Sequence, residues 1–242
     1  MTTQQKTLSA QQIEAFYHDH FVEAQLRNYL ILVPPAVPAP RAIVDVGGGC
    51  GFFAEGLKRA AGLSVRVLDM DPASVRSCHA KDVDAEVGDA LQPPLRGDED
   101  VACFNLVLHH LVGRNEADTT ALQKRALASW RGQAQAVFVD EYIYDAWFAN
   151  ASGRLIYAIT SSRALSAIAS AVSRVVPSLR ANTFGVGVRF RAHDEWCQLF
   201  ESIGYRVVAT VRGAEEGVSL ARRALLIRSC RRDSFVLAAR DN

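Results

Sequence analysis

The sequence lacks the features that mark several large classes of protein. Its five cysteines are an odd number and include no Cys-x-x-Cys pair, which argues against a disulfide framework and against a zinc site. No run of about 18 apolar residues occurs, so we expect neither a membrane-spanning helix nor a membrane partner. The formal net charge is only +1 and the arginines are scattered, which is untypical of a protein that binds nucleic acid. We therefore expect a cytoplasmic protein without a metal site.

Residues 1–40 predict a helical arm that precedes the main domain. Ser9–Gln12 has the pattern of a capping box, and aromatic residues, Tyr17 among them, follow at roughly helical spacing. The stretch Val33–Pro40 contains four prolines, which cannot continue a helix. The arm therefore ends in a linker before residue 41.

From residue 41 onward, short apolar segments alternate with helical patterns. We predict strands at 42–46, 65–68, 85–87, 101–104, 136–139, 205–211 and 234–239. Such a series is typical of an α/β fold with a mostly parallel, doubly wound, seven-stranded sheet. The segment Tyr142–Val176 predicts helices without a strand, whereas Val218–Cys230 fits either a helix or a strand. The predicted division is an arm (1–40), a core (41–141), a helical lid or substrate insert between the fifth and sixth strands (142–192) and the remainder of the sheet (193–242).

The first predicted strand leads directly into a glycine-rich turn. Gly47, Gly49 and Gly51 form a G-x-G-x-G pattern that also contains Gly48. Glycine permits the positive φ of a tight strand-to-helix turn and leaves the backbone open to a ligand. Asp45 precedes this turn, and its carboxylate would repel a pyrophosphate but attract an ammonium group. The spacing also differs from the G-x-G-x-x-G pattern of dinucleotide-binding proteins.

Two further acidic residues follow the next two predicted strands. Asp69, followed by Met70, closes the second strand and could accept hydrogen bonds from two ribose hydroxyl groups. Asp89, followed by Ala90, comes after the third strand and could accept a hydrogen bond from an adenine amino group. Either acid alone could instead be a helix cap or a surface residue. Together with Asp45 they place acids at three successive strand ends, which favours a nucleoside ligand with a positive charge and no phosphate.

In these motifs the chain resembles the class I S-adenosylmethionine-dependent methyltransferases, in their small-molecule branch. Asp45–Gly51 is similar to their first motif, Gly88–Ala90 to their adenine motif and Asp100–Leu111 to their fourth-strand segment. The resemblance implies a reversed seventh strand, S-adenosylmethionine as the cofactor and S-adenosylhomocysteine as the product. The residues that it implies in cofactor binding are Asp45, Gly47, Gly48, Gly49, Gly51, Asp69, Met70, Asp89, Ala90, Asn105, Leu106 and Tyr17. Asn105-Leu106 differs from the Asn-Pro-Pro-Tyr sequence of amino methylases that act on nucleic acid.

Residues after the fourth and fifth predicted strands are the catalytic candidates. The resemblance implies that His109 faces the pocket while His110 packs inward, so His109 is predicted to act as a general base or to orient the acceptor. Glu141 follows the fifth strand at the same edge of the sheet and is the second candidate. Asp140 could take its place, because adjacent strand residues point to opposite faces. His109 could equally be a hydrogen-bonded framework histidine, and Glu141 a structural acid.

The substrate side is predicted from the lid segment. Tyr142, Tyr144 and Trp147 open this segment and are expected to contact the substrate. Arg189 and Arg191 alternate in a glycine-rich stretch, so an extended backbone would place both on one side. They could grip an anionic substrate group, or they could be surface arginines without a role.

We therefore expect an enzyme of the EC 2.1.1 type that methylates an O or N atom of a small molecule, namely a specialised metabolite. An apolar helical lid is typical of an enclosed organic substrate. A nicotinamide-dependent oxidoreductase is one alternative, although Asp45 and the glycine spacing oppose it. A protein that binds the cofactor without methyl transfer is another, since a fold alone does not establish a reaction. The sequence leaves open whether the protein is a monomer or a homodimer.

Overall fold

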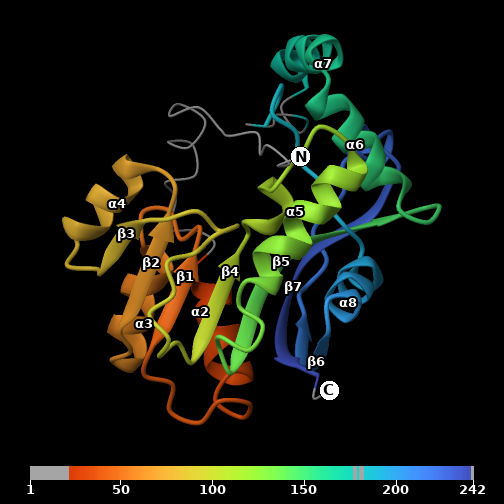
Figure 1. The fold of residues 1–242 in the computed structure, drawn as a ribbon. Helices are drawn as coiled ribbons and strands as arrows, with labels where there is room; N and C mark the ends of the chain where they lie inside the picture. The colour runs from red at the N-terminus through yellow and green to blue at the C-terminus, as the bar shows by residue number, and fades with distance from the viewer. Residues whose placement is uncertain (1–21, 177–178, 180–182, 241–242) are drawn as a thin grey trace.

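A single mixed sheet organises the protein (Figure 1). The computed structural model describes residues 22–176, 179 and 183–240. Its strands are β1 (Ile43–Val46), β2 (Val65–Asp69), β3 (Ala85–Val87), β4 (Val101–Asn105), β5 (Ala136–Ala146), β6 (Tyr205–Arg212) and β7 (Ile227–Ala239). They lie in the order β3-β2-β1-β4-β5-β7-β6.

Only β7 runs against the direction of the other strands. The pairs from β3 across to β5 are all parallel, and β7 pairs antiparallel with both β5 and β6. All four residues of β1 are buried, as expected for a parallel strand that is covered on both faces. The predicted α/β fold, with a mostly parallel sheet and a reversed last strand, is therefore confirmed.

Helices cover both faces of this sheet. They are α2 (Val22–Leu32), α3 (Phe52–Ala61), α4 (Pro72–His79), α5 (Glu116–Ala128), α6 (Ala151–Ser161), α7 (Arg163–Val175), α8 (His193–Ser202), α9 (Leu220–Arg223) and the 3-10 helix η2 (Leu108–His110). On one face, Tyr29 of α2 and Phe53 of α3 contribute to the buried core. On the other face, Leu122 of α5 and Trp196 of α8 belong to a second core. The sheet is thus the middle of three layers.

Helix α2 is the described part of the predicted N-terminal arm, and it ends just before the proline-containing stretch. Two of its polar side chains are buried against the sheet. Gln25 Nε2 donates to Asp140 Oδ1 at 3.4 Å, and Asn28 Nδ2 donates to Ser234 Oγ at 2.9 Å. Ser234 Oγ in turn donates to Asp140 Oδ2 at 2.5 Å. These hydrogen bonds fix the arm to β5 and β7. The predicted capping box lies outside the described residues.

Strands β5 and β7 are longer than predicted. The segment Tyr142–Ala146 continues β5 and is not helical, which corrects the predicted start of the lid. Strand β7 begins at Ile227 rather than at residue 234, and the stretch left open before it contains the short helix α9. The two strands pair from Val137↔Leu237 to Ala146↔Ile227. The prediction was wrong because the partner that stabilises residues 142–146 lies far along the chain.

Helices α6 and α7 separate β5 from β6, where a helical lid was predicted. Ser162 lies between them, and its Oγ accepts a hydrogen bond from the Leu165 N–H at 3.4 Å, which caps α7. Figure 1 shows this pair beyond one end of the sheet, at the top of the view. Within the described ranges no single helix is long and apolar enough to cross a membrane. Helices α6 and α7 together would be long and apolar enough, but they are bent by 99° relative to one another.

Candidate active site

The glycine-rich turn joins β1 to α3 at the carboxyl edge of the sheet. Gly47, Gly49 and Gly51 have φ values of 70°, 55° and 76°, in the left-handed region that favours glycine. Among the described residues, a Cβ atom at Gly49 would meet nothing within 4 Å, whereas one at Gly48 would meet the carboxylate of Asp45. The turn is therefore closed toward the sheet but open at Gly49, where a ligand can lie against the backbone.

Asp45 is buried beneath this turn, and only one of its two carboxylate oxygens accepts a hydrogen bond from the described residues. Its Oδ1 accepts a hydrogen bond from Asn105 Nδ2 at 2.9 Å, while Oδ2 has no partner within the described part of the chain. Burial raises the pKa of Asp45 to about 7. A buried acceptor without a donor is costly, so a ligand that brings an ammonium group would stabilise the ionised carboxylate. This buried acceptor fits the ammonium group at the amino-acid end of S-adenosylmethionine.

Asp69 closes β2 beside the same turn. Its Oδ2 accepts the Gly49 N–H at 2.9 Å and its Oδ1 accepts the Asp71 N–H at 2.8 Å. These bonds fix the carboxylate, and each oxygen keeps a second lone pair for a ribose hydroxyl. Burial raises the pKa of Asp69. Met70, which follows it, is exposed, so its side chain is free to cover a ligand.

The loop after β3 supplies the third predicted acid. Asp89 is half-buried, and its Oδ1 accepts the Leu91 N–H at 2.8 Å, which shapes the loop. Ala90 and Leu91 are buried in one of the two cores. Leu106, just after β4, has a φ of 55° and donates its N–H to the Asp140 carbonyl at 2.8 Å. The residues predicted to hold the cofactor therefore follow β1, β2, β3 and β4, which are neighbours in the sheet.

His109 and Glu141 form a buried pair between η2 and β5. Nδ1 of His109 lies 2.5 Å from Oε2 of Glu141, and Oε1 of Glu141 accepts the Leu108 N–H at 2.7 Å. Burial raises the pKa of Glu141 to about 8 and lowers the pKa of His109 to about 3. The imidazole is therefore neutral, and its tautomer depends on whether Glu141 is ionised.

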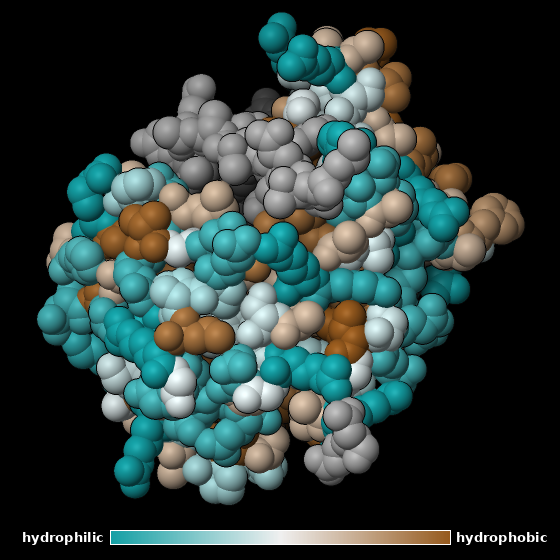
Figure 2. Space-filling model, viewed as in Figure 1, coloured by the Kyte–Doolittle hydropathy of each residue, from teal (hydrophilic) through white to brown (hydrophobic). Residues whose placement is uncertain are grey.

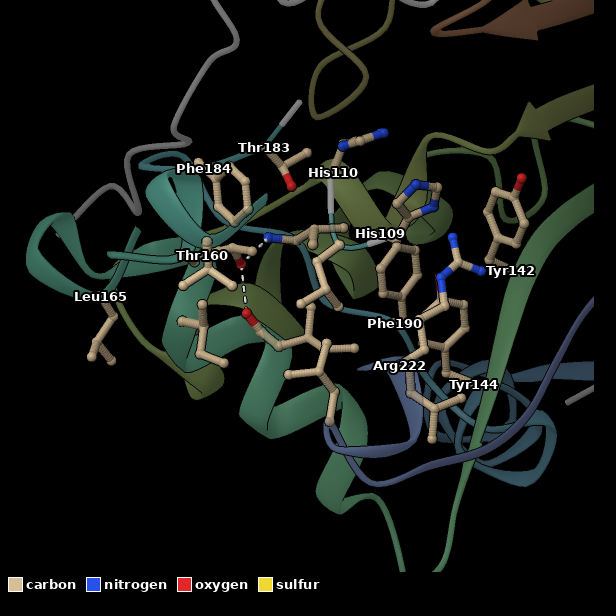
Figure 3. Close-up of a pocket in the computed structure, with 18 of the residues that line it drawn as sticks. His109, His110, Tyr142, Tyr144, Thr160, Leu165, Thr183, Phe184, Phe190 and Arg222 are labelled. Carbon is tan, nitrogen blue, oxygen red and sulfur yellow. Dashed lines mark hydrogen bonds between the residues drawn. The ribbon is translucent and has the colours of Figure 1, made fainter. Parts of the chain in front are cut away.

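His109 lines a cavity of about 440 Å³ (Figure 3). Most of its wall is apolar, including Ile156, Ile159, Ile168, Val172, Val188 and Leu225. Thr160 also lines it, but its hydroxyl donates to the Ile156 carbonyl at 2.7 Å and accepts the Val188 N–H at 3.1 Å. The ring of Phe190 stacks between His109 and Tyr144, with centroid distances of 5.0 and 4.2 Å. The cavity thus suits a largely apolar molecule that reaches the His109 ring.

Comparisons with known proteins agree with this geometry. A family model described as a methyltransferase domain matches residues 44–131, while a comparison with curated proteins finds no match. Three solved structures share the fold: the CcbJ methyltransferase from Streptomyces caelestis (15% identity, TM-score 0.57, covering 96% of each chain), a SAM-dependent methyltransferase from Archaeoglobus fulgidus (14%, 0.55, covering 91% of this chain and 94% of that one) and the 4+2 cyclase SpnF (11%, 0.57, covering 87% and 80%). Residues 44–131 therefore match a methyltransferase domain, and the chain as a whole has the fold of the class I S-adenosylmethionine-dependent methyltransferases.

Some predicted site residues of this methyltransferase domain meet at the cavity and others do not. Tyr142 and Tyr144 line it, as does His109. His110 lines it too, so the prediction that His110 packs inward was wrong. Trp147 lies outside the lining, and its side chain is 55% exposed. Tyr17 lies outside the described residues. In the part of the chain that is described, no group of three or more His, Cys, Asp or Glu side chains could hold a metal ion.

The structure corrects the role predicted for the two arginines of the lid segment. Arg189 is fully buried, and its Nε and Nη2 donate to Glu116 at 2.8 Å and to Glu195 at 3.0 Å. Arg191 is also buried and donates to Gln123 Oε1 at 2.7 Å. Neither guanidinium lines the cavity, because α5 and α8 supply carboxylate partners that the sequence pattern could not reveal. These arginines connect the lid to the core instead of gripping a substrate group.

Most of the apolar cavity wall comes from residues that were not predicted from the sequence. Leu165, Ile168 and Val172 of α7 line the cavity although they are 44%, 62% and 45% exposed. Their spacing of three and four residues is that of one helix face, and this signal could have identified them. In Figure 2, brown side chains gather over the α7 end of the molecule, at the upper right of the view. Phe190 gave no such signal, because its neighbours in sequence are arginines that point elsewhere.

Proposed function

We propose that this protein transfers the methyl group of S-adenosylmethionine to an O or N atom of a small, largely apolar molecule of specialised metabolism, as an enzyme of the EC 2.1.1 type. The observation that carries the proposal is the His109–Glu141 pair at the wall of the apolar cavity. Four residues before His109, Asn105 donates to Asp45 beneath the glycine turn. One short segment therefore connects the cofactor side to the acceptor side.

The two side chains of this pair have different roles in activating the acceptor. S-adenosylmethionine, when bound, supplies an electrophilic methyl group on a sulfonium. Glu141, when ionised, accepts Nδ1–H of His109, so that Nε2 keeps its lone pair and can take a proton from a hydroxyl or protonated amine in the cavity. The apolar walls exclude water, which helps because proximity and alignment supply most of the rate enhancement in a displacement of this kind.

The free cysteines fit the proposed cytoplasmic location. All five are unpaired thiols, as expected in a reducing compartment. The scattered charge supports a small molecule rather than nucleic acid as the acceptor.

The first experiment is calorimetric titration with S-adenosylmethionine, S-adenosylhomocysteine and NAD. We expect binding of the first two and none of NAD, which would also dismiss the nicotinamide-dependent alternative. The protein is then incubated with S-adenosylmethionine and a panel of apolar phenols, amines and carboxylic acids, and S-adenosylhomocysteine is quantified. Formation of that product only with an acceptor, and its loss in His109→Gln, is the expected outcome. Cofactor binding without product across the panel would contradict methyl transfer.

A second candidate function is catalysis without methyl transfer. It is favoured by the structural likeness to SpnF, described as a 4+2 cyclase, and by likeness to a protein described as a pericyclic reaction enzyme, at 12% identity and a TM-score of 0.52. An apolar cavity that binds a flexible molecule in one conformation would be sufficient for such a reaction. Conversion of a ligand to an isomer of equal mass, with no S-adenosylhomocysteine released, would distinguish this function from methyl transfer.

A further inference from the structure

One end of the apolar cavity is marked by a charged side chain. Among the described residues that line the cavity, Arg222 of α9 is the only one with a permanent charge. Figure 3 shows its guanidinium beside Tyr142 and Tyr144, on the opposite side of the cavity from Leu165. The wall therefore has a cationic, phenol-bearing end and an apolar end formed by α6 and α7.

Charged side chains around this end of the cavity affect the pKa values of both tyrosines. Burial raises the pKa of Tyr142 to about 12, Glu216 adds to this rise, and Arg232 and Arg222 oppose it. Burial also raises the pKa of Tyr144, and there too the charge of Arg222 acts in the opposite direction. Both phenols thus remain protonated and able to donate a hydrogen bond.

We propose that Arg222 selects substrates that are amphipathic monoanions, with an apolar body along α6 and α7 and a carboxylate or sulfonate at the Arg222 end. This inference rests on the proposed function in taking the cavity as the substrate site. A guanidinium can bind a carboxylate through two parallel N–H bonds, and a low-dielectric wall strengthens that attraction. Tyr142 and Tyr144 add neutral donors to the same end.

Two fluorescent probes that share one ring system, and differ only in a sulfonate group, test the effect of the Arg222 charge. The first is 1-anilinonaphthalene-8-sulfonate, and the second is N-phenyl-1-naphthylamine, which lacks the sulfonate. We expect the wild-type protein with S-adenosylhomocysteine bound to take up both. Arg222→Gln should weaken binding of the sulfonate by about tenfold or more, the loss expected for a hydrogen bond to a charged group, and leave binding of the neutral probe unchanged. Arg222→Lys should restore part of the affinity.

A matched control and a cavity variant make the result decisive. Arg223→Gln removes the neighbouring, exposed charge on α9 and should leave both affinities unchanged. Ile168→Asp places a carboxylate on the cavity wall at an exposed position, so it should weaken both probes while the chain still folds. An equal loss in Arg222→Gln and Arg223→Gln, an unchanged preference for the sulfonate in Arg222→Gln, or no probe binding by the wild type would overturn the inference. Failure of methyl transfer, measured separately, would overturn only the proposed reaction.

Discussion

Nδ1 of His109 lies 2.5 Å from Oε2 of Glu141, and neither side chain has appreciable contact with solvent. The two residues come from different elements, η2 and β5. A histidine that lines an apolar cavity and is oriented by a buried carboxylate has the arrangement of a general base with its orienting group.

The pair predicts how turnover depends on pH. Below about pH 8 Glu141 keeps its proton and donates to Nδ1, so the ring proton occupies Nε2 and His109 cannot act as a base. Above that pH the carboxylate accepts Nδ1–H and Nε2 is free. We expect kcat to rise as the pH increases through about 8. It should be measured at saturating S-adenosylmethionine, because Asp45 also titrates, near pH 7. A flat kcat profile across this range would contradict the assignment.

Glu141→Gln tests the orienting role. The amide oxygen can still accept the Leu108 N–H, but the amide group would donate to Nδ1 and fix the wrong tautomer of His109. We expect kcat to fall by about 10²-fold with little change in KM, the scale of a lost general base. The rise of kcat near pH 8 should disappear as well. Calorimetry with S-adenosylhomocysteine should show unchanged affinity, and a loss of cofactor affinity would mean that the variant disturbs the fold.

Asp45→Asn tests the ammonium contact. The variant keeps the side-chain contact with Asn105 but loses the charge, so affinity for both S-adenosylmethionine and S-adenosylhomocysteine should fall by about 1.5–3 kcal/mol. Asp100→Asn is the matched control: this carboxylate accepts the Arg41 N–H at 2.7 Å, at the start of β4. It should not change cofactor affinity. Equal titration curves for wild type and Asp45→Asn would place the ammonium group elsewhere.

Gly49→Ala separates backbone strain from ligand contact. Gly49 and Gly132 both have positive φ, and a Cβ atom at either would meet no atom of the described part of the chain within 4 Å. Alanine at either position should therefore lower the free energy of unfolding by about 1 kcal/mol, measured by urea denaturation. Only Gly49→Ala should weaken binding of S-adenosylmethionine. If both variants bind it like the wild type, the ligand does not lie on the turn.

Arg189→Met tests the corrected role of this arginine. Removing a fully buried guanidinium takes away the closest cation to both Glu116 and Glu195 and leaves, among the described cations, only Arg191, at 3.9 and 3.7 Å, so the free energy of unfolding should fall by about 3 kcal/mol. Arg114→Met, which removes an exposed pair with Asp118, should have little effect on stability. The acceptor KM should be unchanged in Arg189→Met wherever the protein remains folded. A raised KM without a loss of stability would restore Arg189 as a substrate ligand.

The parts of the site that sequence could predict are those set by local chemistry. The glycine turn and the acids Asp45 and Asp69 depend on strand ends and on their immediate neighbours, so their placement follows from the order of strand and helix. The continuation of β5 through Tyr142 and Tyr144 depends on pairing with β7, which lies about 90 positions later. Local periodicity holds no information about such a partner, and the segment was therefore predicted as helix.

The positions of charged side chains are also hard to predict from local sequence. Arg189 and Arg191 were expected near the substrate because their alternation is visible in the sequence, but their carboxylate partners lie on α5 and α8. Arg222 was overlooked because the short helix α9 gives no periodic signal, and only the fold brings it to the cavity. Where a charge ends up depends on contacts between distant segments more than on its neighbours.

Asp140 and Glu141 are consecutive in β5, yet their carboxylates find their hydrogen-bond partners in different layers of the structure. Asp140 meets Gln25 and Ser234 on the α2 side, and Glu141 meets His109 on the side of the cavity. Both acids take most of their hydrogen-bond partners from outside β5, so their carboxylates are satisfied only when those other elements have packed. An intermediate that lacks either layer keeps an unsatisfied carboxylate in the middle of the sheet. The proposed general base would therefore be assembled only after both layers have packed.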